Sequence, residues 1–305
     1  LITNNTAVIG PIKDASQSDF NDGTYQMTFY NTSGFVQLNA SNLTGNYTSN
    51  IFDNGIVTSW NNLSFTTEVC YQCELPNNRT VETGDYVRGI NMTGNVLLMH
   101  LNNDSAYGEN NTKVHDFSGY SIDGVANGTF PLFNPNGTFA GAYDFNGIHN
   151  RVLLNMNPLR NYNNFTISAF IKKVDTINGN IIGNRITTDC SGLSLNYVNN
   201  VGYGTNDKSI TLLALSVHPV GACRNSVWST PTNSILQNTW YHVVAVWQNG
   251  TYPRIYINGV DQVLKNWTDQ SNYNVADYAN RTFGIGMATF SYDFSPYNGT
   301  IDEFA

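Results

Sequence analysis

The sequence predicts an all-β protein built from antiparallel strands packed as a sandwich or barrel. No window keeps apolar residues at the i, i+3, i+4, i+7 spacing of an amphipathic helix. Apolar and polar residues alternate over 165–172, as they do in a half-buried strand. The dipeptides Asn249-Gly250 and Asn258-Gly259 separate short apolar runs and favour type I′ hairpin turns. Many short strands joined by such turns are typical of a sandwich or barrel.

Short strands are expected along most of the chain. Their ranges are 25–30, 34–38, 46–52, 56–60, 63–69, 165–172, 212–217, 240–248, 252–257 and 260–264. The last three form a predicted meander. Three regions follow: an extended N-terminal arm at 1–20, a small β-sandwich at 21–93, and a larger sandwich at 94–305.

The chain is acidic and carries few charges. It has 14 Lys and Arg against 22 Asp and Glu, a net charge of −8, and only 12% charged residues. That share is about half the usual one. The acidic balance, without any basic run, argues against nucleic acid and anionic membranes as partners. No apolar stretch approaches the ~18–20 residues of a membrane span.

Asparagine is abundant and often stands in the N-glycosylation pattern Asn-x-Ser/Thr. The chain has 46 Asn and 17 such acceptors, whereas composition alone would give about 8. The acceptors are Asn4, Asn31, Asn39, Asn42, Asn46, Asn62, Asn78, Asn91, Asn103, Asn110, Asn127, Asn136, Asn164, Asn249, Asn266, Asn280 and Asn298. Glycans would replace the missing charge as a solubilising layer, so we expect an extracellular glycoprotein. Leu1 would then be a processed or trimmed start.

The four cysteines are Cys70, Cys73, Cys190 and Cys223. In an oxidising compartment they are expected to form two disulfides, Cys70–Cys73 and Cys190–Cys223. The Cys190–Cys223 loop would stabilise the fold by roughly 3–4 kcal/mol. A zinc site made from the same thiols is the alternative.

A series of motifs runs through residues 94–305. In order, these are Asn95-Val-Leu-Leu-Met-His-Leu-Asn-Asn-Asp104, Asp116-Phe-Ser-Gly-Tyr-Ser-Ile-Asp-Gly124, Ala142-Tyr-Asp-Phe-Asn-Gly-Ile-His-Asn-Arg-Val152, Phe165-Thr-Ile-Ser-Ala-Phe-Ile-Lys172, Trp240-Tyr-His-Val-Val-Ala-Val246, Arg254-Ile-Tyr-Ile-Asn-Gly-Val260, Phe283-Gly-Ile-Gly286 and Gly299-Thr-Ile-Asp-Glu303. This region resembles the laminin-G-like modules of the concanavalin A-like lectin/glucanase superfamily. The resemblance implies an antiparallel jelly-roll sandwich. Residues 21–93 resemble, more loosely, the small β-domains that precede such modules in large archaeal and bacterial surface proteins.

Members of the family usually continue the closing strand beyond the Ile-Asp-Glu motif, whereas this sequence stops at Ala305. Truncation is the simpler expectation. The alternative hypothesis is that residues 1–20 fill the gap in a neighbouring molecule by strand addition.

Glucanases of the superfamily place their catalytic carboxylates on one face of a strand. Asp302 and Glu303 are adjacent, so they point to opposite faces, and no Glu-x-Asp-x-x-Glu run occurs. His242 lies in an apolar strand, where a structural role is expected. The sequence therefore predicts a protein that is not an enzyme.

Calcium is a possible cofactor, because it binds six to eight oxygen atoms. In related modules the first and last strands are neighbours, which would bring Asp116 toward Asp302 and Glu303. Further oxygen donors in the region are Asn102, Asp104 and Asp144. The alternative is that Asp116 and Asp123 only cap turns.

The aromatic residues eligible to stack a sugar are Tyr197, Tyr203, Trp228 and Tyr273.

No acceptor lies between Asn164 and Asn249. A glycan-free docking face around residues 187–232 is therefore expected.

The predicted function is that of a non-enzymatic, N-glycosylated extracellular surface protein with a structural or adhesive role. Its partners would be further copies of itself or other surface proteins, as in a filament or layer. The alternative function is a lectin-like module that binds glycans.

Overall fold

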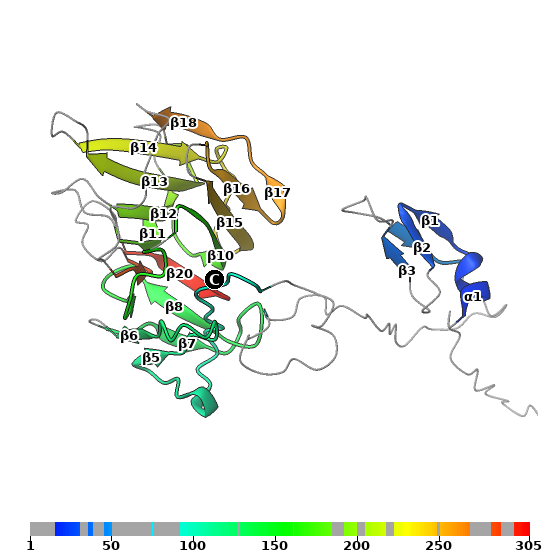
Figure 1. Ribbon diagram of the computed structural model, residues 1–305, viewed down its shortest axis with the longest axis horizontal. Coiled ribbons are helices and arrows are strands. Elements are labelled where there is room, and N and C mark those ends of the chain that lie inside the picture. Colours follow the sequence, from blue (N-terminus) through cyan, green and yellow to red (C-terminus); the bar gives the residue numbers. More distant parts are fainter. Residues whose placement is uncertain are drawn as a thin grey trace, which may run out of the picture. The chain divides into compact units, whose positions relative to one another are not determined.

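The computed structural model describes residues 16–30, 36–38, 46–50, 75, 92–126, 129–160, 162–184, 192–199, 205–217, 223–248, 251–268, 282–287 and 296–305. The chain divides into two compact units between Glu68 and Val69, some way before the predicted boundary at residue 93. Figure 1 labels the elements of both units.

The first element described in this unit is a short helix, α1 (Gln17–Asn21), at the end of the predicted arm, most of which lies outside the described residues. A capping box explains it: the Asp19 backbone N–H donates to Ser16 Oγ, and the Ser16 N–H donates to the Asp19 carboxylate at 2.8 Å. Two antiparallel strand pairs follow. They are β1 (Thr24–Gln26) with β4 (Asn46–Thr48), and β2 (Thr28–Tyr30) with β3 (Val36–Leu38). The strands predicted at 56–60 and 63–69 lie outside the described residues.

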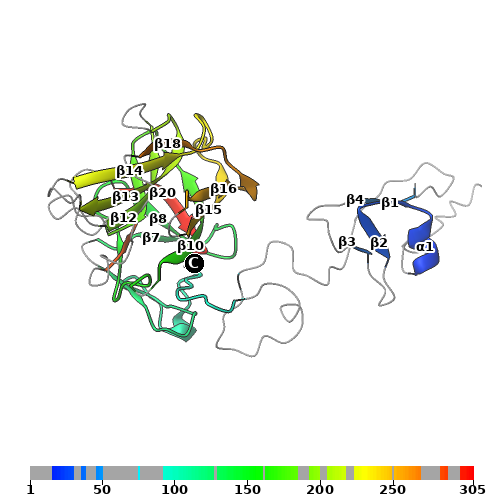
Figure 2. The same cartoon turned by 45° about the horizontal axis from the view of Figure 1, so that its top comes forward.

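The second unit contains two large sheets (Figures 1 and 2). In spatial order, the seven-stranded sheet consists of β17 (Val260–Asp261), β16 (Arg254–Ile257), β15 (Trp240–Gln248), β10 (Asn164–Lys173), β20 (Asn298–Asp302), β8 (Ala142–Asn146) and β7 (Leu132–Asn134). The nine-stranded sheet consists of β18 (Lys265–Thr268), β14 (Cys223–Ser229), β13 (Ser209–Val217), β12 (Gly192–Val198), β11 (Gly179–Gly183), β19 (Gly284–Ile285), β9 (Val152–Leu154), β6 (Gly124–Ala126) and β5 (Lys113–Val114). One 3-10 turn, η2 (Ser105–Tyr107), lies outside the sheets. Every ladder between these strands is antiparallel, which confirms the jelly-roll prediction.

Strand β10 matches the alternation that predicted it. Its odd-numbered side chains from Phe165 to Lys173 are buried, and its even-numbered ones are exposed or half-buried. It pairs with β15 over nine residues, from Asn164↔Gln248 to Lys172↔Trp240. The turn after β16 is also as predicted, because Asn258 and Gly259 have φ angles of 50° and 76°, as a type I′ turn requires.

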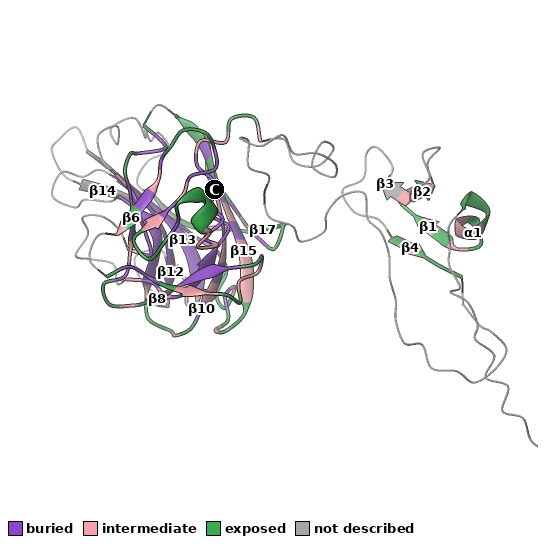
Figure 3. Ribbon diagram, turned by 90° about the horizontal axis from the view of Figure 1, so that it is seen from below, coloured by how far each residue is buried: buried purple, intermediate pink, exposed green. Residues whose placement is uncertain are grey.

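The core lies between the two sheets (Figure 3). Trp247 of β15 stacks on Phe165 at 6.2 Å between ring centroids and meets Trp228 of β14 edge-on at 5.3 Å, so one side chain joins both sheets. Burying a large apolar side chain of this kind stabilises the fold by roughly 1.5–3 kcal/mol. Tyr197 and Trp228, named as eligible to stack a sugar, are 0% and 2% exposed and belong to the core instead. Tyr203 and Tyr273 lie outside the described residues.

The first and last segments of this unit are neighbours, as the resemblance implied. Met99 and Phe304 exchange backbone hydrogen bonds of 2.8 and 2.9 Å. Ala305 exchanges a second pair, of 2.7 and 2.9 Å, with Ser168 of β10. The closing segment therefore lies between Met99 and β10.

No helix in the described part of the chain is both long enough and apolar enough to span a membrane.

Candidate binding site

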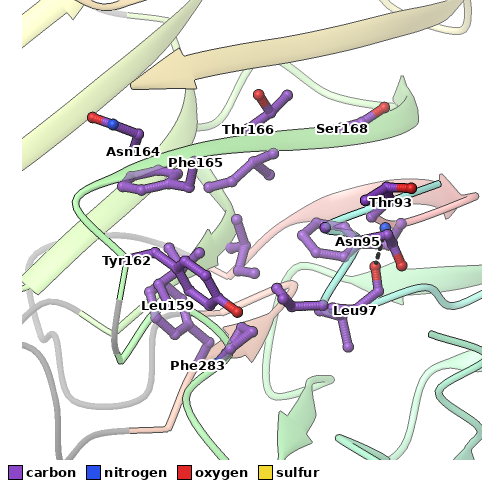
Figure 4. A pocket seen from close by; sticks show the side chains of 17 residues that line it. Thr93, Asn95, Leu97, Leu159, Tyr162, Asn164, Phe165, Thr166, Ser168 and Phe283 are labelled. Carbon is purple, nitrogen blue, oxygen red and sulfur yellow. Dashed lines mark hydrogen bonds between the residues drawn. The ribbon is translucent and has the colours of Figure 1, made fainter. Parts of the chain in front are cut away.

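A cavity of ≈ 380 Å³ opens where β10 begins (Figure 4). Its apolar lining includes Leu97, Leu159, Phe165, Ile182, Phe283 and Phe304. Its polar lining consists of Thr93, Asn95, Tyr162, Asn164, Thr166 and Ser168. None of the 17 lining side chains is charged. The volume falls within the usual range of ligand pockets, about 300–1,000 Å³.

Several segments that are distant in the sequence line this cavity, which we call the slot. They are residues 93–97, residues 158–162, the first half of β10, Ile182, Phe283, and Phe304 with Ala305. Figure 4 shows Thr166 and Ser168 on one side of the β10 ribbon and Leu159 on the other.

Beyond the Ala305–Ser168 pair, the same edge of β10 has no backbone partner at Thr166 among the described residues. Ser168 directs its backbone N–H and C=O to Ala305, on the side away from β15. Residues two apart in a strand direct these groups to the same side. The backbone N–H and C=O of Thr166 therefore point away from β15, and no described residue pairs with them.

Asn95 adds a buried side-chain acceptor to the slot. Its Nδ2 donates to the Leu97 carbonyl at 3.0 Å, while its Oδ1 receives no hydrogen bond from the described residues.

The three proposed calcium ligands each have other partners. Asp116 is fully buried and accepts four hydrogen bonds, from the backbone N–H groups of Leu98, Ser118 and Ile122 and from the Ser118 hydroxyl. This is the turn-capping role that the sequence offered as the alternative. Among the described residues, no three His, Cys, Asp or Glu side chains gather as metal ligands. Calcium binding by Asp116, Asp302 and Glu303 stays a prediction, and no ligand set among these residues supports it.

Asp302 and Glu303 point in different directions, as strand alternation predicted. Asp302 Oδ2 accepts the backbone N–H groups of Thr138 and Phe139 at 2.6 and 3.0 Å. Glu303, with φ at 46°, leaves the strand geometry and contacts His100 Nδ1 at 2.6 Å. Burial raises the pKa of Asp302 to about 7, and the negative charge of Glu303 adds to the effect. The two acids do not share a cleft in which they could act together on a glycosidic bond.

The seven-stranded sheet carries a Ser–His contact on its outer face. Ser168 Oγ lies 2.9 Å from His242 Nε2, and the His242 ring stacks on Phe170 at 4.5 Å. Burial lowers the pKa of His242, so the ring is neutral at pH 7. Among the described residues no carboxylate contacts His242, which leaves the pair without the orienting group of a catalytic triad. The contacts of His242 with Ser168 and Phe170 fit the structural role that the sequence predicts for it.

Residues 145–305 match a laminin G model described as the concanavalin A-like lectin/glucanases superfamily. The match covers more than half of the chain and includes β10, β15 and β20. The chain belongs to this superfamily. No curated protein matches the sequence.

Several solved structures resemble this concanavalin A-like chain. They include the receptor binding domain of botulinum neurotoxin mosaic serotype C/D (16% identity, TM-score 0.46), the binding domain of botulinum neurotoxin serotype D (16%, 0.45) and the binding domain of Paraclostridial Mosquitocidal Protein 1 (14%, 0.47). Each alignment covers 68% of this chain and 46–47% of the other. The chain thus spans less than half the length of these structures, and identities this low bear on the fold alone.

Seven of the 17 predicted glycan acceptors of this superfamily member lie among the described residues. Asn46, Asn110, Asn136, Asn164 and Asn266 are exposed, and Asn103 and Asn298 are half-buried. The other ten lie outside the described residues: Asn4, Asn31, Asn39, Asn42, Asn62, Asn78, Asn91, Asn127, Asn249 and Asn280. Cys70, Cys73 and Cys190 also lie outside them, and of Cys223 only the backbone is described, at the start of β14. Glycosylation and both disulfides stay predictions.

The docking face predicted at 187–232 has an acceptor beside it in the concanavalin A-like fold. Asn266 of β18 pairs with Trp228 of β14 and is exposed. Spacing along the sequence cannot show this, because strand pairing brings Asn266 next to a segment far from it in the chain. Residues 187–191, 200–204 and 218–222 of that face lie outside the described residues. The slot beside β10 is therefore the better-defined candidate.

The raised pKa of Asp302 predicts a pH-dependent stability. Its folded-state pKa of about 7 exceeds the ordinary value of 3.8 for an aspartate, so its contribution to stability is complete below pH ~4 and is lost as the pH rises through ~7. Asp302→Asn keeps the shape and removes the charge. We expect the variant to gain stability relative to wild type between pH 5 and pH 8, by on the order of a few kcal/mol. Denaturant unfolding at both pH values measures this. Asp261→Asn, at an exposed site, is the control; equal differences at both pH values would contradict the assignment.

Proposed function

We propose that this chain is a non-enzymatic, N-glycosylated extracellular surface protein with a structural or adhesive role, which associates with further copies of itself. The slot beside β10 is the observation that carries the proposal. Its uncharged lining, mostly apolar with a few polar groups, suits a neutral segment of a polypeptide partner. The 17 acceptors support the extracellular location, since the modification belongs to secreted surfaces.

The surroundings of each asparagine in the Asn-x-Ser/Thr pattern predict which of these sites carry glycans. The Asn298 amide donates to Asp175 at 2.7 Å and is half-buried, and Asn103 accepts from the Tyr143 hydroxyl at 3.3 Å. Transfer of a glycan needs an accessible amide nitrogen, so we expect high occupancy at exposed Asn110, Asn136 and Asn266 and low occupancy at half-buried Asn103 and Asn298. Enzymatic deglycosylation in heavy-oxygen water followed by peptide mass spectrometry measures each site. Uniform absence of glycans on secreted protein would contradict the extracellular proposal.

Self-association predicts a concentration-dependent mass in solution. Light scattering coupled to size exclusion is run at concentrations spanning about two orders of magnitude. The weight-average mass should rise above that of one glycosylated chain, whose polypeptide alone is 33.8 kDa. Enzymatically deglycosylated protein is the matched control, since loss of glycans should not abolish a contact made through the slot. A mass that stays monomeric throughout would overturn the structural role.

Carbohydrate binding is the second candidate, and Tyr162 favours it. This side chain is 41% exposed and lines the same slot as Asn95. An exposed aromatic ring in a slot that also offers a neutral amide suits a sugar, which offers C–H faces and hydroxyl groups. If the slot binds glycans, a glycan array should give a discrete set of ligands, and Tyr162→Ala should weaken them by at least ~10-fold, about 1.4 kcal/mol. Tyr252→Ala, at a similarly exposed tyrosine outside the slot, is the control. An array without signal leaves only the polypeptide role.

A further inference from the structure

We infer that the side chains of Lys173 and Asn298 become joined by an amide bond, in a reaction that the Asp175 carboxylate assists. The residues meet at one end of the ladder between β10 and β20. Lys173 is the last residue of β10 and the register partner of Gly299, and Asn298 is the first residue of β20. The inference concerns a covalent modification within one chain, so it does not depend on the proposed self-association.

Asp175 contacts both of the groups that would react. One of its carboxylate oxygens accepts a hydrogen bond from Lys173 Nζ, and the other accepts from the side-chain amide of Asn298 at 2.7 Å. Lys173 Nζ also donates to the backbone carbonyl of Asn298 at 3.0 Å. Because both oxygens belong to one carboxylate, the amine and the carboxamide are held beside each other. Such positioning replaces the encounter of two separate reactants.

The amine of Lys173 is enclosed by the protein. The residue is 0% exposed, and its Nζ lies 5.2 Å from the centre of the Tyr197 ring and 5.4 Å from that of the Tyr297 ring. Both tyrosines are fully buried. Burial lowers the pKa of Lys173, against the opposing effect of Asp175. The surroundings therefore favour the neutral amine, which is the form of lysine that acts as a nucleophile.

Asp175 is suited to carry the proton. Burial by itself would raise its pKa, but the hydrogen bonds from Lys173 and Asn298 outweigh burial and lower the pKa below the ordinary value. The carboxylate is therefore ionised and can accept a proton from Nζ. It also contacts the amide nitrogen that would leave, so it can deliver a proton there. Its side chain is 24% exposed, which gives the released nitrogen a path to solvent.

The reaction balances without a further reagent. The Lys173 ammonium gives a proton to Asp175, and the free amine attacks the side-chain carbonyl carbon of Asn298. A bond forms between Nζ and Cγ, and the bond between Cγ and Nδ2 breaks. The departing nitrogen takes up the two protons that Nζ loses, with Asp175 as the carrier. An ammonium group and a carboxamide thus become a secondary amide and an ammonium ion, and nothing is oxidised or reduced.

The link would fasten β20 to β10 with a covalent bond. Residues 173 and 298 are 125 positions apart, so the link closes a long loop. A cross-link of this kind restricts the unfolded chain as a disulfide does, but it needs no oxidising compartment. It also removes the nitrogen to which a glycan would be attached. The link and a glycan at Asn298 therefore exclude each other.

Peptide mass spectrometry of the purified wild-type chain tests the link and needs no variant to fold. Trypsin should cut after Lys172, Arg185 and Arg281. We expect one species that joins residues 173–185 to the peptide beginning at residue 282, with a mass lower than their sum by one ammonia molecule. Fragmentation should place the branch at Lys173 and Asn298.

Four other results would overturn the link. The first is two separate, unmodified peptides. The second is loss of ammonia within the peptide that begins at residue 282, which marks a cyclic imide at Asn298-Gly299. The third is loss of water within residues 173–185, which marks a bond between Lys173 and Asp175. The fourth is a glycan on Asn298.

Two matched variants test the part that Asp175 plays. Asp175→Asn keeps the shape of the side chain and removes the proton carrier, so the link should form at least ~100-fold more slowly, as is usual for loss of general acid–base catalysis. Asp261→Asn, at a carboxylate that is 44% exposed on β17, should form the link at the wild-type rate. The linked fraction is measured at intervals after expression, and circular dichroism checks folding. A folded Asp175→Asn variant that links as fast as wild type would contradict the assigned role.

Discussion

The backbone pairing of β10 is the constraint on which the rest of the second unit depends. β15 pairs with one edge of the strand over nine residues, and β20 pairs with the other edge only from Phe170 to Lys173. Buried N–H and C=O groups need partners, so the long ladder with β15 fixes the register in which Phe165 meets Trp247 and the core forms. The shorter ladder with β20 is continued by the backbone pair of Ala305 and Ser168. The same strand thus fixes the core through one edge and lines the slot with its first half.

The closing segment shows how the fold meets this constraint near its end. After Asp302 the backbone turns at Glu303, whose φ of 46° takes one residue out of the ladder. Pairing then resumes on both sides, from Phe304 to Met99 and from Ala305 to Ser168. Asp302 is held by backbone N–H groups of the 138–139 loop, and Glu303 by His100.

The sequence alone predicts much of the second unit and little of the site. Alternation over 165–172 and the Asn258-Gly259 turn identify β10 and the β16–β17 hairpin correctly, because these are local properties. Trp228, named as eligible to stack a sugar, is a core residue, because its polar neighbours on β14 hide a core-facing position that only strand pairing reveals. The slot joins segments near residues 95, 165 and 305, and no local pattern reports that these segments meet. The pairing of Asn266 with Trp228 could not be predicted for the same reason, because the two residues are distant in the sequence.

The scarcity of charge bears on how such a surface can be specific. With 12% charged residues and an uncharged slot, this chain cannot steer a partner by electrostatic complementarity in the way that charged interfaces do. Selection must come from shape and from hydrogen bonds of fixed direction. The apolar side chains and the neutral polar groups of the slot can supply both, whereas a charged segment would lose its hydration there without compensation. The same neutrality would make such a contact insensitive to ionic strength. That property would suit the extracellular role proposed for this chain, in which glycans replace charges as the solubilising layer.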